Sequence, residues 1–233
     1  SLRPKKTEKI TNMHHSWPEM HKFYLTEIFY KNYTSEMPLW LEKEANCEFI
    51  HISNEINTIR KDIKILEVGC GDFRVSKYVK KYHPKNVTIY GTDIFKEHEL
   101  PKETIEKWTS ENIVYQTLDT QKLYFEKLYY IIPYTQQFDV IILFGVDCLL
   151  EKDQLEAYCQ QMMLLLKEDG IIIWQTQRRF TFKAIKLFIK DRHLGYKNRF
   201  MRFYKKLAQN YNFRISKIYK TNMSKILIYK KTI

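Results

Sequence analysis

The sequence predicts an α/β fold with a doubly wound, mostly parallel seven-stranded sheet, an antiparallel C-terminal edge and an N-terminal helical cap. In the middle of the chain, short apolar runs alternate with helical segments, which is the pattern of βαβ units. At the C-terminal end, two strands follow each other across a turn signal at Thr221 and Asn222. A terminal strand pair of this kind indicates antiparallel pairing at one edge of the sheet.

The N-terminal segment is predicted to be helical from about Trp17 to Thr58. Pro18 is well placed at a helix start, and Pro38 divides the segment into two helices. Apolar and aromatic side chains recur there at helical spacing: Phe23, Tyr24, Ile28, Phe29 and Tyr33. We therefore expect a helical cap or lid over residues 1–60 and a sheet domain over 61–233, with a basic substrate-facing insertion at 178–206.

The other elements follow from the same patterns. The almost continuous apolar run 138–144 is typical of a parallel strand that helices cover on both faces. Strands are expected at 63–68, 87–92, 113–116, 138–144, 170–176, 213–219 and 225–229. Helices are expected at 73–82, 102–109, 152–166, 181–191 and 199–211.

Charge is distributed unevenly along the chain. The formal net charge is +12, from 39 basic and 27 acidic residues. Residues 61–177 carry 14 basic and 18 acidic side chains, whereas residues 178–233 carry 17 basic side chains and one acid, Asp191. Such asymmetry is typical of a surface that faces phosphates, nucleic acid or acidic lipid.

Composition excludes several classes of protein. No apolar run approaches the roughly 20 residues that a membrane span needs. The first residues lack the apolar stretch of a secretory signal. The four cysteines and the histidines show no metal-ligand spacing, so no metal site is expected. These features predict a cytoplasmic location in a reducing setting.

The segment Glu67-Val-Gly-Cys-Gly-Asp-Phe73 carries the strongest chemical signal. Glycines at 69 and 71 directly after a buried strand allow a tight turn and close approach of a ligand to the backbone. A dinucleotide fingerprint would need a further glycine at position 74, which is Arg74 here. Because Glu67 would repel a pyrophosphate, the segment suits a ligand that carries an ammonium group.

These residues make the chain resemble the class I S-adenosylmethionine-dependent methyltransferases. The acidic-x-Gly-x-Gly motif of that family matches Glu67, Gly69 and Gly71, whereas Phe73 stands where the family often has a third glycine. The resemblance covers about residues 60–177 and, weakly, the two closing strands. It implies S-adenosylmethionine as cofactor and a set of cofactor-binding positions: Glu67, Gly69, Cys70, Gly71, Asp93, Ile94, Asp119, Thr120 and Phe144.

The resemblance also implies a role for several of these residues. Asp93 matches the acid that binds the ribose hydroxyls, and Ile94 matches an apolar residue that packs on adenine. Asp119, followed by Thr120, matches an acid near the adenine amine. Independently of the family, ligands of doubly wound sheets bind at the carboxyl ends of the strands, where these residues are expected.

The methyl acceptor is expected near the loops after the fourth and fifth strands. Asp147 is a candidate for orienting or deprotonating an acceptor, or alternatively for capping the next helix. His14 and Tyr24 are candidates that reach the cleft from an N-terminal lid. Gln175, Arg178 and Arg179 stand at positions suited to substrate contacts. The loop lacks the Asn-Pro-Pro-aromatic pattern of exocyclic-amine methyltransferases, which argues against methylation of base amines.

The segment 178–206 combines eleven basic residues with seven aromatic ones. This combination suits phosphates held beside stacked bases. Alternatively, Phe182, Phe188, Phe200 and Phe203 face the core. Three functions stay open: methylation of a small anionic metabolite, either phosphorylated or nucleotide-linked; methylation of tRNA or rRNA; and binding without catalysis. The first is favoured, and the oligomeric state is left open.

Overall fold

The computed structural model describes residues 22, 26, 39–83, 85–117, 137–147, 150–177, 199–222 and 224–232, with the side chains of 39–45 left aside. Several predicted features fall outside these ranges. They are the helix 181–191 and the site residues His14, Tyr24, Asp119, Thr120, Arg178 and Arg179.

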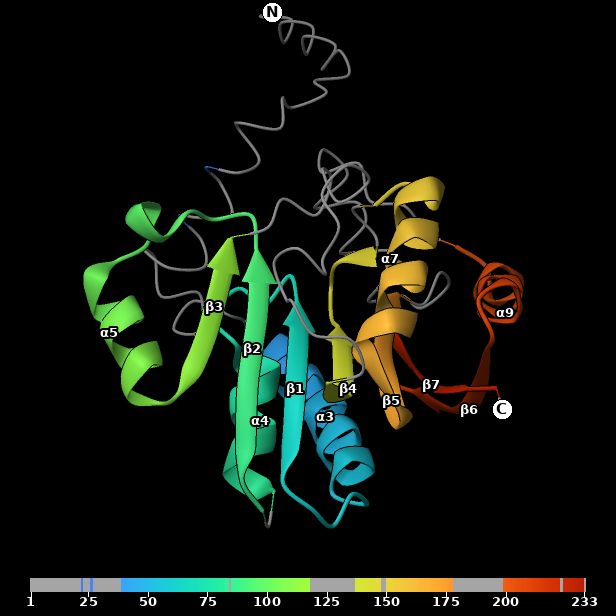
Figure 1. The fold of residues 1–233 in the computed structure, drawn as a ribbon, viewed down its shortest axis with the longest axis horizontal. Helices are drawn as coiled ribbons and strands as arrows, with labels where there is room; N and C mark the ends of the chain where they lie inside the picture. Colours follow the sequence, from blue (N-terminus) through green and yellow to red (C-terminus); the bar gives the residue numbers. More distant parts are fainter. Residues whose placement is uncertain are drawn as a thin grey trace, which may run out of the picture.

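One seven-stranded sheet forms the centre of the fold (Figure 1). Its strand order is β3-β2-β1-β4-β5-β7-β6. The strands span Ile63–Val68 (β1), Val87–Asp93 (β2), Ile113–Thr117 (β3), Phe138–Leu143 (β4), Leu166–Gln177 (β5), Phe213–Lys220 (β6) and Ser224–Lys231 (β7). Strands β1 to β5 pair in parallel, and β7 is antiparallel to both β5 and β6. The predicted fold class is confirmed.

Helices cover both faces of the sheet. Behind it in Figure 1 lie α3 (Leu39–Ile56) and α4 (Arg74–Tyr82), and in front lies α7 (Lys152–Leu165). The others are the short η2 (Glu97–Glu99), α5 (Lys102–Ser110) and α9 (Met201–Asn210). Because successive strand residues point to opposite faces, Ile65 joins the core under α3 and α4 while Leu66 joins the core under α7 and α9.

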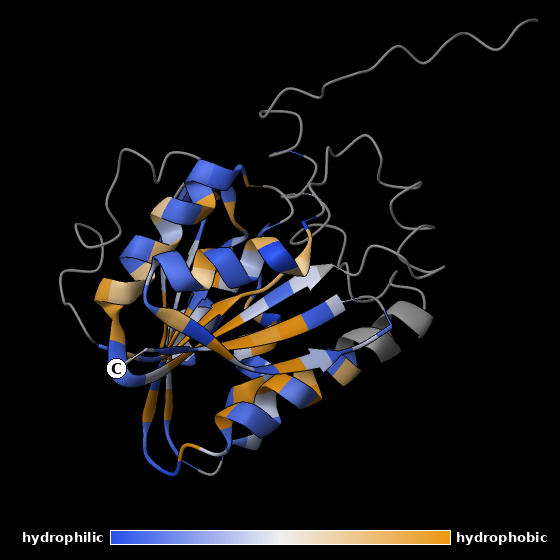
Figure 2. Cartoon of the chain, turned by 90° about the vertical axis from the view of Figure 1, so that its right-hand side faces the viewer, coloured by the Kyte–Doolittle hydropathy of each residue, from blue (hydrophilic) through white to orange (hydrophobic). Residues whose placement is uncertain are grey.

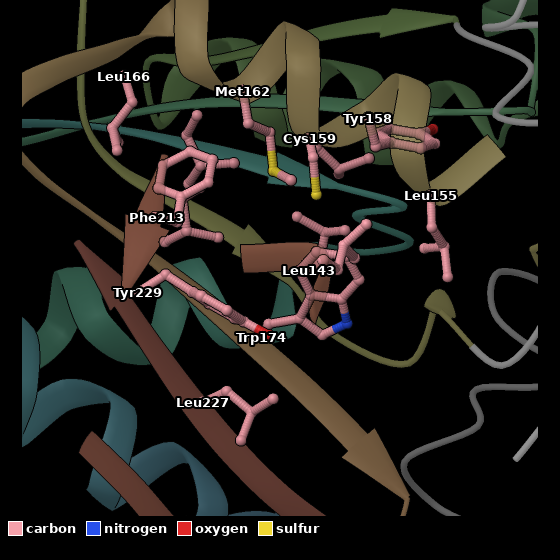
Figure 3. Packing of buried hydrophobic residues seen from close by; sticks show 14 of the residues in the cluster. Leu143, Leu155, Tyr158, Cys159, Met162, Leu166, Trp174, Phe213, Leu227 and Tyr229 are labelled. Atoms are coloured by element: carbon pink, nitrogen blue, oxygen red, sulfur yellow. The ribbon is translucent and has the colours of Figure 1, made fainter. Parts of the chain in front are cut away.

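Hydrophobic residues are concentrated along the strands of the sheet, and the helices around it carry both hydrophobic and hydrophilic residues (Figure 2). In the core under α7, Trp174 and Tyr229 of the sheet face Cys159 and Met162 of the helix (Figure 3). Trp174 is 1% exposed and packs in this core.

The second half of α3 packs against the sheet. Phe49, Ile52 and Ile56 are buried in the same cluster as Ile65 of β1. At the end of the helix, Glu55 accepts hydrogen bonds from Lys217 Nζ at 2.8 Å and Tyr219 Oη at 2.7 Å, both on β6. This part of the predicted cap therefore packs on the sheet, and the division into a cap or lid and a sheet domain stays a prediction.

Strand β5 begins earlier than the sequence predicts. It starts at Leu166, immediately after α7, whereas the apolar pattern indicates a start at Gly170. Leu166 pairs with Phe138, and the register of β4 on β5 shifts between Phe138 and Val140. The sequence does not indicate this extension, because the residues between Leu166 and Gly170 are polar. Strand pairing at a bulge does not require the apolar periodicity by which strands are predicted.

Candidate active site

The turn between β1 and α4 is tied to the end of β2. Gly69 has φ 67° and Gly71 has φ 50°, in the left-handed region that glycine adopts easily. The amides of Gly69 and Cys70 donate to the carbonyl of Thr92 at 2.8 and 3.1 Å. The glycine turn therefore lies at the carboxyl ends of two adjacent parallel strands.

Asp93 connects the same two strands through its side chain. One carboxylate oxygen accepts the amide of Gly71 at 2.7 Å, and the other accepts the amide of Ile94 at 2.7 Å. Asp93 is buried at the end of β2. The structure thus brings together Gly71, Asp93 and Ile94, as the sequence predicts for one cofactor site.

Glu67 is turned away from solvent and bonded to α4. Its carboxylate accepts the amide of Ser76 at 3.1 Å and also the Ser76 hydroxyl. Burial raises the pKa of Glu67 to about 8, and the nearby charges of Asp72 and Asp93 add to the rise. Burial at this position thus favours the protonated form of Glu67, whereas the hydrogen bonds from Ser76 favour the ionised form.

The amides of the turn are already used within the protein. In addition to the bonds above, Phe73 N donates to the carbonyl of Cys70 at 2.8 Å, and Ser76 N donates to Glu67. Phosphate sites at helix starts depend on amides that point at the ligand. This turn therefore does not form a phosphate cradle, which agrees with the departure from a dinucleotide fingerprint at Arg74.

Phe73 replaces the usual third glycine and fills space. It adopts φ 61°, and its fully buried ring packs against Trp108 at 5.0 Å between centroids. A Cβ on Gly91 would lie 2.0 Å from Phe73 Cε1. The glycine on β2 thus makes room for the aromatic ring on the turn, a compensation that the family motif does not reveal.

The end of β4 forms the neighbouring part of the site. Phe144 is partly buried and lies 5.6 Å from Phe49 between ring centroids. Gly145 has φ 73°, and a Cβ added there would meet no atom within 4 Å. The Gly145 amide donates to Gln175 Oε1 at 2.9 Å. Gln175, predicted to contact substrate, therefore also supports the loop after β4.

Glu48 on α3 is a polar residue of this region that sequence reasoning missed. It is 4% exposed and accepts Gln175 Nε2 at 3.1 Å and Thr221 Oγ1 at 3.0 Å. Ser224 also donates to its carboxylate. The available signal was an acid four residues before Ile52, on the face of α3 that otherwise packs against the sheet.

Asp147 is 2% exposed and faces the protein interior. Its carboxylate accepts the Tyr204 hydroxyl, and its carbonyl accepts Arg199 Nη1 at 2.7 Å. Burial raises its pKa despite these contacts. A catalytic role for Asp147 stays a prediction. The start of α7 is instead capped by Glu151, whose side chain accepts a backbone amide of the first turn.

A basic hollow lies at the start of α9. Its volume is about 520 Å³, and it is lined by Arg199, Phe200, Arg202, Phe203 and Lys206. Phe200 is 62% exposed, so the alternative in which it faces the core is wrong for this residue, whereas Phe203 packs against the edge of the core. Phe200 immediately precedes the helix, where its side chain lies outside the buried face formed by Tyr204, Leu207 and Ala208.

The residues that the structure describes contain no group of three or more His, Cys, Asp or Glu side chains arranged to hold a metal ion. Among the helices of those residues, none is long and apolar enough to cross a membrane.

Comparison with known proteins agrees with this geometry. Residues 66–172 match the family model described as a methyltransferase domain. Magnesium protoporphyrin IX methyltransferase from Synechocystis PCC 6803 is similar in structure, with a TM-score of 0.61 and 13% identity over 91% of this chain and 95% of that chain. No curated protein sequence matches the chain.

Two other solved structures resemble the chain over part of their length. Human N-acetylserotonin methyltransferase gives a TM-score of 0.55 and 18% identity over 73% of this chain and 48% of that one. The mitomycin 7-O-methyltransferase MmcR gives a TM-score of 0.57 and 12% identity over 73% of this chain and 49% of that one. The chain therefore spans about half the length of these two proteins, and identities this low establish the fold alone.

The sheet order, the antiparallel β7 and the glycine turn beside Asp93 define a Rossmann-like domain of the methyltransferase type. Together with the match to a methyltransferase domain over residues 66–172, these features give the chain the fold of the class I S-adenosylmethionine-dependent methyltransferases.

Proposed function

We propose that this protein transfers a methyl group from S-adenosylmethionine to a small anionic metabolite, either phosphorylated or nucleotide-linked. The use of S-adenosylmethionine is supported above all by the contact between Asp93 and Gly71. This contact puts a carboxylate beside a turn whose amides already donate to acceptors within the protein. This environment suits a cationic ligand with ribose hydroxyls better than a phosphate.

The residues at the ends of β2 and β4 fit such a cofactor. Asp93 would accept the ribose hydroxyls, while Ile94 and Phe144 would supply apolar surface for the purine. Gly145 leaves open space at the end of β4, since a side chain there would meet nothing within 4 Å. When bound, S-adenosylmethionine supplies an electrophilic methyl group on its sulfonium. The protein's part is to hold acceptor and methyl group in line, which is mainly a matter of positioning.

The basic hollow supports an anionic acceptor. Arg202 and Lys206 are one helical turn apart on α9 and exposed, and the exposed side chain of Phe200 lines the same hollow. In the sequence, the residues that line the hollow come directly after the segment 178–198. Arg178 and Arg179 of that segment are also proposed to contact the acceptor. Cations with an exposed aromatic ring suit a phosphate attached to a planar or sugar group.

The cofactor half is tested by titrating wild-type protein and the Asp93→Ala variant with S-adenosylhomocysteine in a calorimeter. We expect the variant to bind at least about 10-fold more weakly, the effect of losing hydrogen bonds to a charged group. Asp153→Ala, which removes an exposed aspartate on α7, is the control and should leave the affinity unchanged. Absence of wild-type binding at millimolar concentration would contradict the proposed function.

The acceptor half is tested with uridine diphosphate glucose and a 20-nucleotide RNA as probes. We expect Lys206→Ala and Arg202→Ala to weaken binding of the nucleotide sugar, while Lys205→Ala, outside the hollow, has no effect. Binding of the RNA with an affinity that falls steeply with salt, and no binding of the nucleotide sugar, would favour an RNA acceptor instead.

A further inference from the structure

A buried hydrogen-bond chain joins α9 to the loop after β4. Thr176 Oγ1 on β5 donates to Tyr204 Oη at 2.6 Å, and Tyr204 donates in turn to the Asp147 carboxylate. Thr176, Tyr204 and Asp147 are 4%, 1% and 2% exposed. Hydrogen bonds of this kind are costly to break in a buried setting, because the abandoned acceptor has no water to replace its donor.

Arg199 holds the backbone of the same loop. Its guanidinium donates to the carbonyl of Asp147 at 2.7 Å and to the carbonyl of Leu150. Its planar group also lies over the Phe203 ring, 5.3 Å from the centroid. Arg199 immediately precedes α9 and Tyr204 lies within it. The loop is therefore fastened to α9 through both its backbone and a side chain.

The loop continues this connection to the glycine turn. Val146, next to Asp147, packs against Gly69 so closely that a Cβ on Gly69 would lie 2.3 Å from Val146 Cγ2. On the other side, Gly145 N is held by Gln175. A shift of Asp147 is thus transmitted by direct contact to the turn where the cofactor is proposed to bind.

We propose that Tyr204 is a positioning residue for cofactor binding, which acts through Asp147 on residues 145–147 and so on the Gly69 turn. This inference rests on the proposed function, since it concerns the same cofactor site. In this proposal, Asp147 acts as the hydrogen-bond acceptor for Tyr204 inside the protein. It also means that residues 145–147 connect α9, which lines the basic hollow, to the glycine turn of the proposed cofactor site.

The buried tyrosines provide a matched pair of variants. Tyr204→Phe removes the hydroxyl that donates to Asp147. Tyr229→Phe removes a hydroxyl from the same core, 3% exposed, whose oxygen has no hydrogen-bond partner among the described residues. Both substitutions keep the aromatic ring, so the two variants differ in the hydrogen bond and not in packing volume.

The experiment measures hydrogen–deuterium exchange of the peptide that contains residues 143–147, and the Kd for S-adenosylhomocysteine. In Tyr204→Phe we expect faster exchange of the Gly145 and Val146 amides and a Kd about 3- to 30-fold higher, the range typical of residues that couple through a network. Tyr229→Phe should match the wild type in both measurements.

Three results are informative. Unchanged exchange and Kd in Tyr204→Phe would overturn the proposal, as would an equal loss in Tyr229→Phe, which would indicate general loosening of the core. If the wild type binds no S-adenosylhomocysteine, the proposed function fails and the positioning role in cofactor binding fails with it. In that case the exchange measurement still shows whether the hydrogen bond orders the loop.

Discussion

Val146 packs directly on Gly69, so that a methyl group added to Gly69 would lie 2.3 Å from Val146 Cγ2. The two residues follow β1 and β4, which are neighbours in the sheet although far apart along the chain. The contact fixes the distance between the glycine turn and the loop after β4, the two segments on which the proposed cofactor site is built.

This contact makes Gly69→Ala a severe change. We expect a loss of about 2–4 kcal/mol in the free energy of unfolding, from the left-handed backbone and the overlap with Val146 together. Gly145→Ala is the matched control, because its φ is 73° but nothing lies within 4 Å of the added methyl group. It should cost about 1 kcal/mol. Urea unfolding measures both, and equal losses would show that the Val146 contact is unimportant.

Glu67 should make stability depend on pH in a defined direction. Burial raises its pKa from 4.5 to about 8, so the native state holds a proton that the unfolded chain releases. Its contribution to stability therefore falls between about pH 4.5 and pH 8, by up to about 1.4 kcal/mol per pH unit. Relative to wild type, Glu67→Gln should flatten this decline in urea unfolding measured from pH 5 to pH 8.

The control for this measurement is Glu103→Gln, which changes an exposed glutamate on α5 and should leave the pH profile as it is in the wild type. A decline in Glu67→Gln as steep as that of the wild type would assign the pH dependence to other groups.

Phe73 and Gly91 should behave as a coupled pair. Gly91→Ala puts a Cβ 2.0 Å from the buried Phe73 ring and should cost about 1–3 kcal/mol or more. Phe73→Gly leaves a cavity and should cost about 2–4 kcal/mol, partly offset by relief of the left-handed backbone. In the double variant the ring is gone, so the combined loss should be smaller than the sum by about 1–3 kcal/mol.

A second pair tests the specificity of that coupling. Leu227 lies in the core on the other face of the sheet. The loss in the free energy of unfolding from Leu227→Ala should therefore add to the loss from Gly91→Ala within about 0.5 kcal/mol. If the losses in the free energy of unfolding from Phe73→Gly and Gly91→Ala were additive, the predicted coupling would be wrong. The turn would then relax enough to accommodate the Phe73 ring beside an alanine at position 91.

Asp139 should stabilise the opposite end of the sheet. Burial alone would raise its pKa, but hydrogen bonds from Lys167, the Lys64 amide and Lys61 hold the pKa below its ordinary value. The carboxylate is 3% exposed and lies 2.8 Å from Lys167 Nζ. We expect Asp139→Asn to lower the free energy of unfolding by about 1–3 kcal/mol at pH 7.

The sign of the pH effect follows from the lowered pKa. The contribution of Asp139 is present above the unfolded pKa and is lost as the pH falls through the folded pKa, so wild type and Asp139→Asn should converge in acid. Asp169→Asn is the control, since Asp169 is 72% exposed and pairs with Lys61 at the surface. It should cost under about 0.5 kcal/mol.

Much of the fold was predictable because its signals are local. The apolar runs of β1, β2 and β4 and the glycines at 69 and 71 depend on neighbours in the sequence, so their positions follow from the sequence alone. The meeting of Gly71 with Asp93 was also predictable, because the carboxyl ends of adjacent parallel strands share one edge.

Local patterns do not show what a polar side chain bonds to. Glu67 has the same place in the motif whether it is ionised or protonated, and the balance depends on burial, which raises its pKa, and on the hydrogen bonds from Ser76, which lower it. Glu48 and Asp147 likewise acquire their partners from elements more than fifty residues away.

The α/β class, the order of the elements, the uneven charge and the residues that meet at the glycine turn follow from the amino-acid sequence. In contrast, the fit of Phe73 beside the glycine at position 91 and the contact of Asp147 with Tyr204 are apparent only in the folded structure. Periodicity and motifs report the conformation of a segment and the face it buries. Packing distances and hydrogen-bond partners depend on how segments far apart in the chain come together.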